Sequence, residues 1–225
     1  MHDSTGFDYG MWPAAIISAG LIFFFIGSYM LPTRRREWRS MGLFAAWIVA
    51  LFTEMYGIPL TIYALTTLLG RTYPVLNPFT HQNGHLLVAL AGGSTAVWIL
   101  VMALSTALLW GGIWVISRGW QLIHKAQGES LVVEGIYSRV RHPQYLGLFM
   151  IIIGLLIQWP TIISLVMAPI LFWSYIRLAR REEGEMITQF GEVYQTYKEN
   201  VPAFIPQRLG IASTSFHDPQ EDVST

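Results

Sequence analysis

Five long apolar stretches constrain the fold of this chain more than any other feature of its sequence. A helix needs about 20 apolar residues to cross the hydrocarbon core of a bilayer. Only 12% of the 225 residues are charged, against about 25% in ordinary soluble domains. The sequence therefore predicts an all-α integral membrane protein with about five transmembrane helices. The expected spans are Met11–Leu31, Ser40–Gly70, Ser94–Ser117, Gln144–Gln158 and Thr161–Leu178.

The positions of Lys and Arg predict how these spans are oriented. Basic residues gather in Thr33–Arg39, in Arg118–Arg141 and after Arg177, whereas the turn at Trp159-Pro160 has none. Cytoplasmic loops of membrane proteins carry an excess of Lys and Arg. Five spans with the N-terminus outside place all three basic segments in the cytoplasm. The prediction is a protein of the cell or inner membrane whose C-terminal third faces the cytoplasm.

Several classes of function are excluded or left without support. The chain has no cysteine, which excludes disulfides, thiolate catalysis and Cys-ligated metals. Its formal net charge is zero, so nothing indicates nucleic-acid binding. No glycine-rich dinucleotide fingerprint follows a predicted strand. His81 and His85 can share one helix face, but without a third ligand they indicate interfacial polar residues rather than a metal site.

Two features inside the predicted spans concern helix packing and the cost of a buried charge. Ala103, Ala107 and Gly111 recur at four-residue spacing, which predicts a small-residue face for close helix contact. Glu54 lies inside the second span, beside Gly57 and Pro59 that interrupt it. An ionisable residue in a span is unfavourable unless it is paired or hydrated. Glu54 therefore either lines a substrate cavity or forms a hydrogen bond that locks its helix to a neighbour.

One short segment differs from the apolar sequence around it. Residues Gly135–Gly147 read G-I-Y-S-R-V-R-H-P-Q-Y-L-G. Pro143 disfavours a helical conformation at His142, so the pair predicts a fixed turn just before a helix. Taken alone, these residues favour a basic loop beside the membrane over a functional site.

A polar but periodic stretch, Arg181–Asn200, predicts an amphipathic C-terminal helix. Its apolar face comprises Met186, Phe190, Val193, Tyr194 and Tyr197, which recur at helical spacing. Helices that lie on anionic lipid usually carry Lys and Arg, whereas this one is acidic. We therefore expect it to pack on protein, over the basic R-H-P segment, and to end at V-P-A-F-I-P.

The motifs in this order resemble one family of membrane enzymes. The set G-I-Y-S-R-V-R-H-P-Q-Y-L-G, a tight helical hairpin, R-L-A-R-R-E-E, F-G-E-V-Y-Q-T-Y-K and V-P-A-F-I-P is similar to that of the isoprenylcysteine carboxyl methyltransferases and their phospholipid methyltransferase-like relatives. The resemblance covers about Gln121–Pro206. It implies an integral membrane methyltransferase that binds S-adenosylmethionine between the R-H-P loop and the C-terminal helix, with an acceptor entering from the bilayer.

The resemblance also implies roles for individual residues. An arginine one turn before the acidic pair contacts the substrate in the family, but the matching position here is Leu178, so Arg177 is the nearest candidate and Arg180 an alternative. Glu129 stands where relatives typically carry His. The implied cofactor-binding residues are His124, Glu129, Ser130, Leu131, Val132, Tyr137, His142, Pro143, Gln144, Tyr145 and Glu182.

The chemistry of methyl transfer suits these residue types. Acids such as Glu182 hold ammonium or hydroxyl groups, and His142 or an arginine holds a carboxylate. Transfer is a single in-line displacement that depends on positioning and needs no protein nucleophile. A carboxylate acceptor needs only an orienting cation such as Arg177. An amine acceptor needs a base, for which Glu54 or Glu183 is available. We therefore take Arg177 and Glu54 as the candidate catalytic residues.

The resemblance divides the chain into three regions. Residues 1–117 form the N-terminal spans and a variable substrate half, 118–206 the methyltransferase core, and 207–225 a polar tail that we expect to be disordered. The expected partners are S-adenosylmethionine, a lipid-like or apolar acceptor bearing a carboxylate, amine or thiol, and membrane lipid. Two alternatives stay open: an NADPH-dependent membrane reductase related to sterol reductases, and a non-catalytic transporter or structural protein. The acceptor's identity and the oligomeric state are also open.

Overall fold

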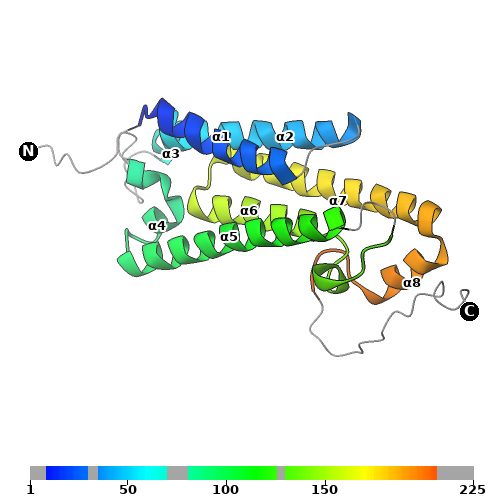
Figure 1. Ribbon diagram of the computed structural model, residues 1–225. Helices are drawn as coiled ribbons and strands as arrows, with labels where there is room; N and C mark the ends of the chain where they lie inside the picture. Colours follow the sequence, from blue (N-terminus) through cyan, green and yellow to red (C-terminus); the bar gives the residue numbers. More distant parts are fainter. Residues whose placement is uncertain (1–8, 30–34, 70–80, 126–129, 207–225) are drawn as a thin grey trace, which may run out of the picture.

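The computed structural model describes residues 9–29, 35–69, 81–125 and 130–206, and within these ranges every regular element is a helix. Figure 1 shows the helices lying roughly along one direction, with α5 and α6 side by side. The predicted all-α class is confirmed. The helices are α1 (Trp12–Tyr29), α2 (Arg35–Phe52), α3 (Leu60–Leu69), α4 (Leu86–Leu90), α5 (Thr95–Lys125), α6 (Pro143–Gln158), α7 (Ile162–Phe190) and α8 (Glu192–Asn200), with a π-helix at Thr53–Gly57 and 3-10 helices at His81–Gly84 and Gly135–Ser138.

Three helices within these ranges are long and apolar enough to cross a membrane. They are Ser40–Gly57, which joins most of α2 to the π-helix, and the helices α5 and α7. Helices α1 and α6 are apolar but shorter. Three helices of this kind support a membrane protein, and they account for three of the predicted spans.

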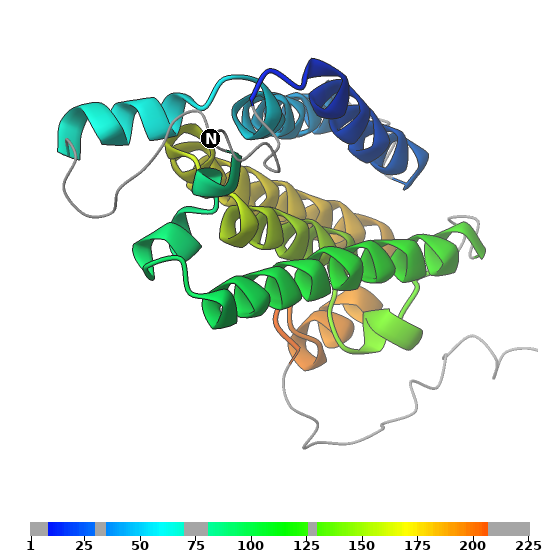
Figure 2. The same ribbon diagram turned by 90° about the vertical axis from the view of Figure 1, so that its left-hand side faces the viewer.

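The second predicted span is shorter than expected. Ile58 is extended, with φ −122° and ψ 113°, and Pro59 follows it. Proline lacks an N–H and clashes with the preceding turn of a helix, so the helix ends at Gly57. Helix α3 then sets off in another direction, as Figure 2 shows. The predicted interruption of Ser40–Gly70 at Gly57 and Pro59 is therefore confirmed, and the apolar helix before it ends at Gly57.

Helices α5 and α6 approach each other through glycines. A Cβ atom on Gly112 would lie 2.5 Å from the carbonyl oxygen of Gly147, and one on Gly154 would lie 3.0 Å from that of Ser105. Such a contact has no room for a side chain. The buried face of α5 contains Ser105, Gly112 and Gly119 at seven-residue spacing, which returns almost to the same side of a helix.

The small-residue face predicted on α5 was only partly right. Ala103 and Ala107 are exposed, while Gly111 is partly buried. Ala103 stands two positions from Ser105, which is about 200° around the helix axis. The packing face therefore follows a seven-residue period, and the two alanines lie outside it.

Helix α7 extends through the predicted boundary between the last span and the C-terminal helix. Thr161 caps its start, because its hydroxyl accepts a hydrogen bond from the Ser164 N–H at 3.0 Å. The helix is continuous to Phe190 and stops at Gly191, whose φ of 56° is a left-handed value that glycine adopts without strain. The predicted single helix Arg181–Asn200 is thus the end of α7 plus the short helix α8.

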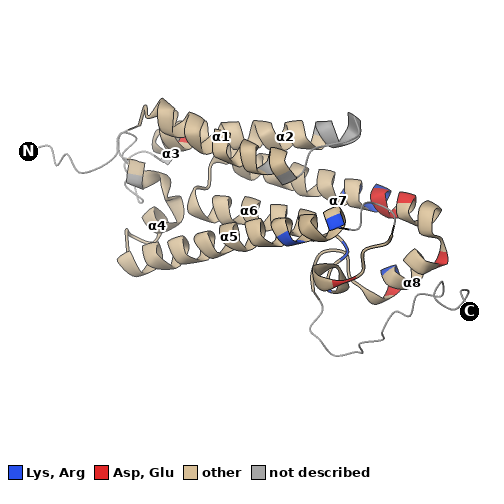
Figure 3. Ribbon diagram, in the orientation of Figure 1, with Lys and Arg blue, Asp and Glu red and all other residues tan. Residues whose placement is uncertain are grey.

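Charged residues are concentrated at one end of the molecule. In Figure 3 the described Lys, Arg, Asp and Glu residues gather mainly where α7 ends and α8 begins. The buried core lies between α2, α6 and α7, and includes Trp47, whose indole N–H donates to the Ser164 carbonyl at 3.0 Å. The apolar bundle therefore holds the polar end in a fixed position.

We expect Gly147→Ala to lower the melting temperature of the detergent-solubilised protein. The new Cβ would lie 2.6 Å from both the Gly112 carbonyl oxygen and Ile116 Cγ1, and overpacking of this kind destabilises by about 1–3 kcal/mol. The control is Gly42→Ala, because a Cβ on Gly42 meets nothing within 4 Å. Thermal unfolding followed by size-exclusion chromatography tests both variants. Equal melting temperatures would refute the importance of this contact.

Candidate functional site

The R-H-P segment forms the predicted turn at the start of α6. His142 has φ −122° and ψ 64° and stands at the N-cap position, with Pro143 as the first helical residue. Proline suits this position because the first helical N–H has no partner in the helix. The Leu146 N–H then donates to the His142 carbonyl at 3.0 Å. The turn is therefore fixed by the helix that follows it.

The segment after α8 lies against this turn and is hydrogen-bonded to it. The backbone N–H of Arg141 donates to the Pro202 carbonyl at 2.9 Å, and that of His142 to the Ala203 carbonyl at 3.0 Å. The Tyr197 hydroxyl donates to the Tyr137 carbonyl at 2.6 Å. The C-terminal segment thus covers the R-H-P loop, in the arrangement expected from its acidic composition.

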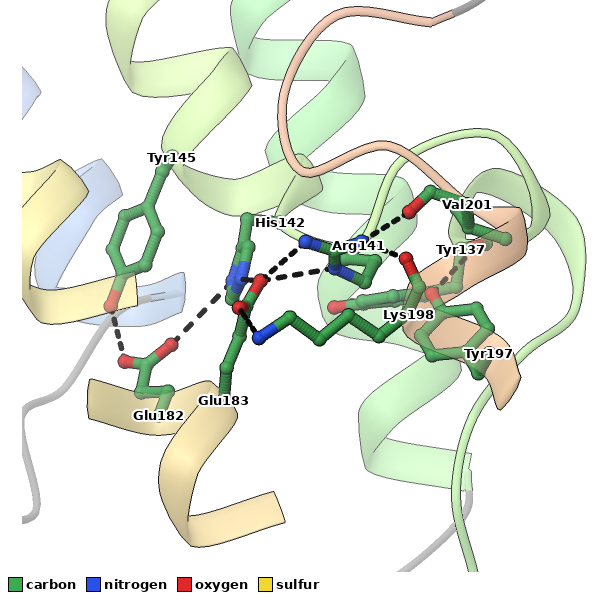
Figure 4. Close-up of polar contacts among 9 residues, drawn as sticks. All are labelled: Tyr137, Arg141, His142, Tyr145, Glu182, Glu183, Tyr197, Lys198 and Val201. Atoms are coloured by element: carbon green, nitrogen blue, oxygen red, sulfur yellow. Dashed lines mark hydrogen bonds and ion pairs between the residues drawn. The ribbon is translucent and has the colours of Figure 1, made fainter. Parts of the chain in front are cut away.

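An ion-pair network centred on Glu183 joins three segments, as Figure 4 shows. Arg141 donates to Glu183 Oε1 from Nε at 3.0 Å and from Nη2 at 2.7 Å. Lys198 Nζ lies 2.9 Å from Glu183 Oε2, and His142 Nε2 lies 3.2 Å from Oε1. Arg141 Nη1 also donates to the carbonyls of Lys198 and Val201. The R-H-P loop, α7 and α8 are therefore tied to one buried carboxylate.

The partners of Glu183 control its protonation. Glu183 lies past the apolar part of α7, within the charged end of the helix. Burial acts to raise the pKa of Glu183, but the hydrogen bonds from His142, Lys198 and Arg141 outweigh it and hold that pKa well below its usual range. Glu183 is thus ionised at neutral pH, and its charge is matched within the network.

A cavity of about 350 Å³ lies beside this network, within the range of about 300–1,000 Å³ typical of small-molecule sites. Its walls come from α5, the loop before α6, the end of α7 and α8. Nine of the eleven residues predicted to bind a cofactor line it, namely Ser130, Leu131, Val132, Tyr137, His142, Pro143, Gln144, Tyr145 and Glu182. The structure therefore gathers residues that span more than 50 positions of sequence around one space.

Four predicted site residues are not among those that line the cavity. His124 is exposed on α5, where its ring stacks on Trp120 with centroids 5.6 Å apart. Arg177 is also exposed, with its guanidinium 5.2 Å from the Trp173 ring centroid. Glu54 lines a small cavity with Trp159 and Thr161, at the C-terminal end of α6. The cavity beside His142 lies at the other end of that helix, which is about 24 Å long at 1.5 Å per residue. Glu129 lies outside the described residues.

Several lining residues were not assigned to the site from the sequence. They are Ile123, Arg141, Met186, Gln189, Phe190, Tyr194 and Tyr197. Four of these belong to the apolar face of the predicted C-terminal helix, which was interpreted as a packing face. The signal was present in that face, but periodicity does not distinguish a side chain that packs on protein from one that lines a cavity. Val193, from the same predicted face, is exposed.

The polar and aromatic groups of the cavity have distinct roles. Glu182 accepts a hydrogen bond from the Tyr145 hydroxyl, and its other oxygen lies 3.8 Å from His142 Nδ1. Burial, and then the charge of Glu183, raise the pKa of Tyr194 to about 12. Burial likewise raises the pKa of Tyr137. The tyrosines are therefore neutral at pH 7, and offer aromatic faces and hydroxyls to a ligand.

The described residues contain no group of three or more side chains suited to bind a metal ion. His85 donates from Nδ1 to the Gln158 carbonyl at 2.9 Å, and the His81 ring packs on Trp159 with centroids 4.5 Å apart. Both histidines thus pack at the end of the bundle away from the cavity.

Comparison with known proteins shows which family part of this sequence is similar to. Residues 96–188 match the model of the isoprenylcysteine carboxyl methyltransferase family. Three similar proteins are all named protein-S-isoprenylcysteine O-methyltransferase. The one from Schizosaccharomyces pombe is 32% identical over 77 residues, 34% of this chain and 33% of that protein. The human one is 34% identical over 88 residues, 39% and 31% of the two chains.

The third relative extends over more of the chain. The protein from Dictyostelium discoideum is 27% identical over 212 residues, which are 86% of this chain and 88% of that protein. The matches to the first two relatives span only about a third of their lengths. No solved structure matches the chain.

We expect Arg141→Ala to expose the segment after α8 to proteolysis. The change removes the bonds to Glu183 and to two carbonyls, whereas Arg139→Ala, two residues away, alters an exposed side chain. Trypsin cleavage after Lys198, followed by mass spectrometry, should be at least several times faster in Arg141→Ala than in the wild type. A cleavage rate equal to that of Arg139→Ala would show that the arginine does not hold this segment.

We expect Glu183→Gln to lower stability by about 3 kcal/mol at neutral pH, because it removes one member of a buried ion pair. The pKa of Glu183 is lower in the folded protein than its ordinary value of 4.5. The ionised carboxyl therefore contributes its full stabilisation of the fold when the pH is above 4.5, and contributes less as the pH falls below 4.5. The gap in melting temperature between the wild type and Glu183→Gln should therefore be constant from pH 8 to about pH 5.5 and narrow toward about pH 4. A gap that widens with acid would contradict the assigned charge.

Proposed function

Since residues 96–188 match the model of the isoprenylcysteine carboxyl methyltransferase family, we propose that this chain is a member of that family and an integral membrane methyltransferase that uses S-adenosylmethionine. The cofactor binds in the 350 Å³ cavity beside the R-H-P turn. The acceptor is a hydrophobic molecule that reaches the cavity from the bilayer. The observation that carries this proposal is the charge of the residues that line the cavity.

Both cationic side chains beside the cavity are already bonded to Glu183. Arg141 is the only Lys or Arg among the described lining residues, and it pairs with Glu183, as does Lys198. Glu182 is a second carboxylate and lies on the cavity wall. S-adenosylmethionine carries a sulfonium and an ammonium against one carboxylate, and Glu182 can attract either of these positive groups. NADPH carries several phosphate charges, which need unpaired Arg or Lys.

The lining residues fit the separate parts of the cofactor. Glu182 would hold the ammonium group or ribose hydroxyls, and His142 would contact the carboxylate. Tyr137, Tyr145 and Tyr194 offer neutral aromatic faces for the adenine and for the sulfonium, which is attracted to the face of a ring. The side chains of Leu131 and Val132 supply apolar contact. When bound, the cofactor supplies an activated methyl group.

The protein's contribution to the reaction is to position the reactants and keep water out. In-line transfer needs the acceptor atom, the methyl carbon and the sulfur close to one line, and holding two reactants in that order accounts for much of the rate. The relatives' names refer to methylation of an oxygen on isoprenylcysteine. We propose the same acceptor class here, an apolar chain that ends in a carboxylate, ahead of an amine or a thiol.

We propose that five helices cross the membrane with the N-terminus outside, and that the cavity faces the cytoplasm. Helices α1 and α6 are then the two shorter spans beside the three long ones. The basic residues of α5, such as Arg118 and Lys125, lie at the end nearest the cavity, as the excess of positive charge on cytoplasmic sides requires. Helix α5 is continuous through Ser117, so no structural boundary separates the substrate half from the methyltransferase core. We propose that the two regions differ in function only.

We expect S-adenosylhomocysteine to raise the melting temperature of the purified protein, because a ligand that binds only the folded state stabilises it by mass action. NADPH should leave the melting temperature unchanged. Glu182→Gln should weaken S-adenosylhomocysteine binding at least tenfold by calorimetry, or about 1.4 kcal/mol. Glu182 suits this test better than His142, because His142 also contacts the Glu183 network and its loss would disturb the fold.

The matched control is Glu185→Gln, an exposed acid one turn further along α7. It should bind S-adenosylhomocysteine as the wild type does. Stabilisation by NADPH without stabilisation by S-adenosylhomocysteine would reject the methyltransferase in favour of a reductase. Equal losses of affinity in the two variants would mean that Glu182 acts through overall charge, and not through contact with the cofactor.

A further inference from the structure

A second polar site lies at the end of the bundle away from the cofactor cavity. Glu54, in the π-helix, is only 2% exposed. Its Oε2 accepts a hydrogen bond from the Thr61 N–H at 2.8 Å, but its buried Oε1 has no hydrogen-bond partner among the described residues. The buried hydroxyl of Tyr9 also lacks a partner within those residues. Two orphaned oxygens therefore occur in one region.

Both oxygens belong to residues that line the same small cavity. Its volume is about 10 Å³, and Tyr9, Glu54, Thr61 and Thr161 are among its lining residues. This is roughly the smallest space that holds one water molecule. The cavity therefore has room for a single water or a monatomic ion, and for nothing larger.

The charge of Glu54 is not matched by the side chains around it. Every ion pair that the structure describes involves Glu182 or Glu183, at the other end of the molecule. Neither of the nearby histidines bonds to Glu54, because His85 already donates to the Gln158 carbonyl and the His81 ring packs on Trp159. A buried carboxylate without a counter-charge is strongly unfavourable.

We propose that this cavity binds one alkali cation, with Na⁺ the best fit, and that Glu54 Oε1 and the hydroxyl oxygen of Tyr9 are two of its ligands. Oxygen donors of this kind suit hard cations. A single carboxylate matches the single positive charge of an alkali cation, whereas a divalent cation would keep one unmatched charge. The smallness of the cavity favours Na⁺ over K⁺. Interrupted membrane helices provide ion sites of this type elsewhere, and the π-helix ends at such an interruption.

The cation would fasten the segment just before α1 to the interruption that follows the π-helix. Tyr9 immediately precedes Gly10, whose N–H donates to the Tyr56 carbonyl at 2.9 Å, and the Met11 N–H donates to the same carbonyl at 2.9 Å. Glu54 is bound on its other side to the first turn of α3 through Thr61. An ion between Tyr9 and Glu54 would therefore link the N-terminal segment, the π-helix and α3.

The test is the melting temperature of the full chain in uncharged detergent, with NaCl replacing choline chloride at constant ionic strength. The wild type should show a saturable rise of several degrees as Na⁺ increases, and K⁺ should require a higher concentration. Tyr9→Phe should shift the Na⁺ midpoint upward several-fold, because it removes one ligand and leaves the ring. No cofactor is needed, so the result is independent of the proposed methyltransferase activity.

Glu54→Gln should abolish the Na⁺ dependence, while Glu185→Gln, which changes an exposed acid on α7, should retain it. If Glu54→Gln does not fold, Tyr9→Phe and the comparison of Na⁺ with K⁺ still decide the matter. A wild-type melting temperature that is the same in Na⁺ and choline would overturn the proposal, and would assign the cavity to a water molecule or to a protonated Glu54. An unchanged Na⁺ response in Tyr9→Phe together with Glu54→Gln would place the ion elsewhere and overturn it as well.

Discussion

The pairing of Arg141 with Glu183 is the interaction on which the cavity at the charged end of the molecule depends. Both side chains are about nine-tenths buried, and each also bonds to groups from other segments. A buried charge left without its partner is strongly destabilising, so neither residue can change alone. This pair fixes the distance between the R-H-P turn and α7, and it closes the segment after α8 over both. The residues that we propose to contact the cofactor, such as Glu182 and Tyr145, line the cavity and are positioned by their neighbours in the sequence.

The membrane helices hold that pair at a defined place. The glycine contact between α5 and α6 brings Gly119 close to Pro143, where a Cβ would lie 3.2 Å from the proline ring. The turn is thereby pressed against the last turns of α5, which contribute Ile123 to the cavity. Helix α7 then carries the acidic pair out of the apolar bundle as part of one continuous helix. The geometry of the site therefore follows from helix packing as much as from the polar network.

Much of this site could be predicted from the sequence because its residues are contiguous. Ser130–Val132 and His142–Tyr145 line the cavity as short runs, so a motif that identifies one member identifies the rest. The roles of Arg141 and Glu183 were harder to predict. The sequence R-R-E-E places two carboxylates side by side and does not indicate which of them faces the cavity. The answer depends on how α7 is rotated against α6. Arg177 was assigned by its distance along the chain from Glu182, yet it lies on the exposed side of the helix.

The fold shows the same division between local and tertiary information. The apolar stretches predicted the helices, and proline explained the start of α6. The interruption after Gly57 follows from Pro59 and was predicted. The break at Gly191 was not predicted, because it depends on a glycine with a positive φ inside a stretch whose periodicity indicated one helix. The face of α5 that meets α6 could not be predicted from small residues alone, because both a four-residue and a seven-residue series were present. Only the partner helix selects between them.

The hydrogen bonds from Arg141 and His142 to the carbonyls of Pro202 and Ala203 have a consequence for biosynthesis. The wall that closes the cavity is encoded after all of the membrane helices that the structure describes, so a ribosome delivers it last. A nascent chain can thus complete its helical bundle while the cavity is still open on this side. Tight retention of the proposed cofactor would then mark chains whose translation and folding have both finished.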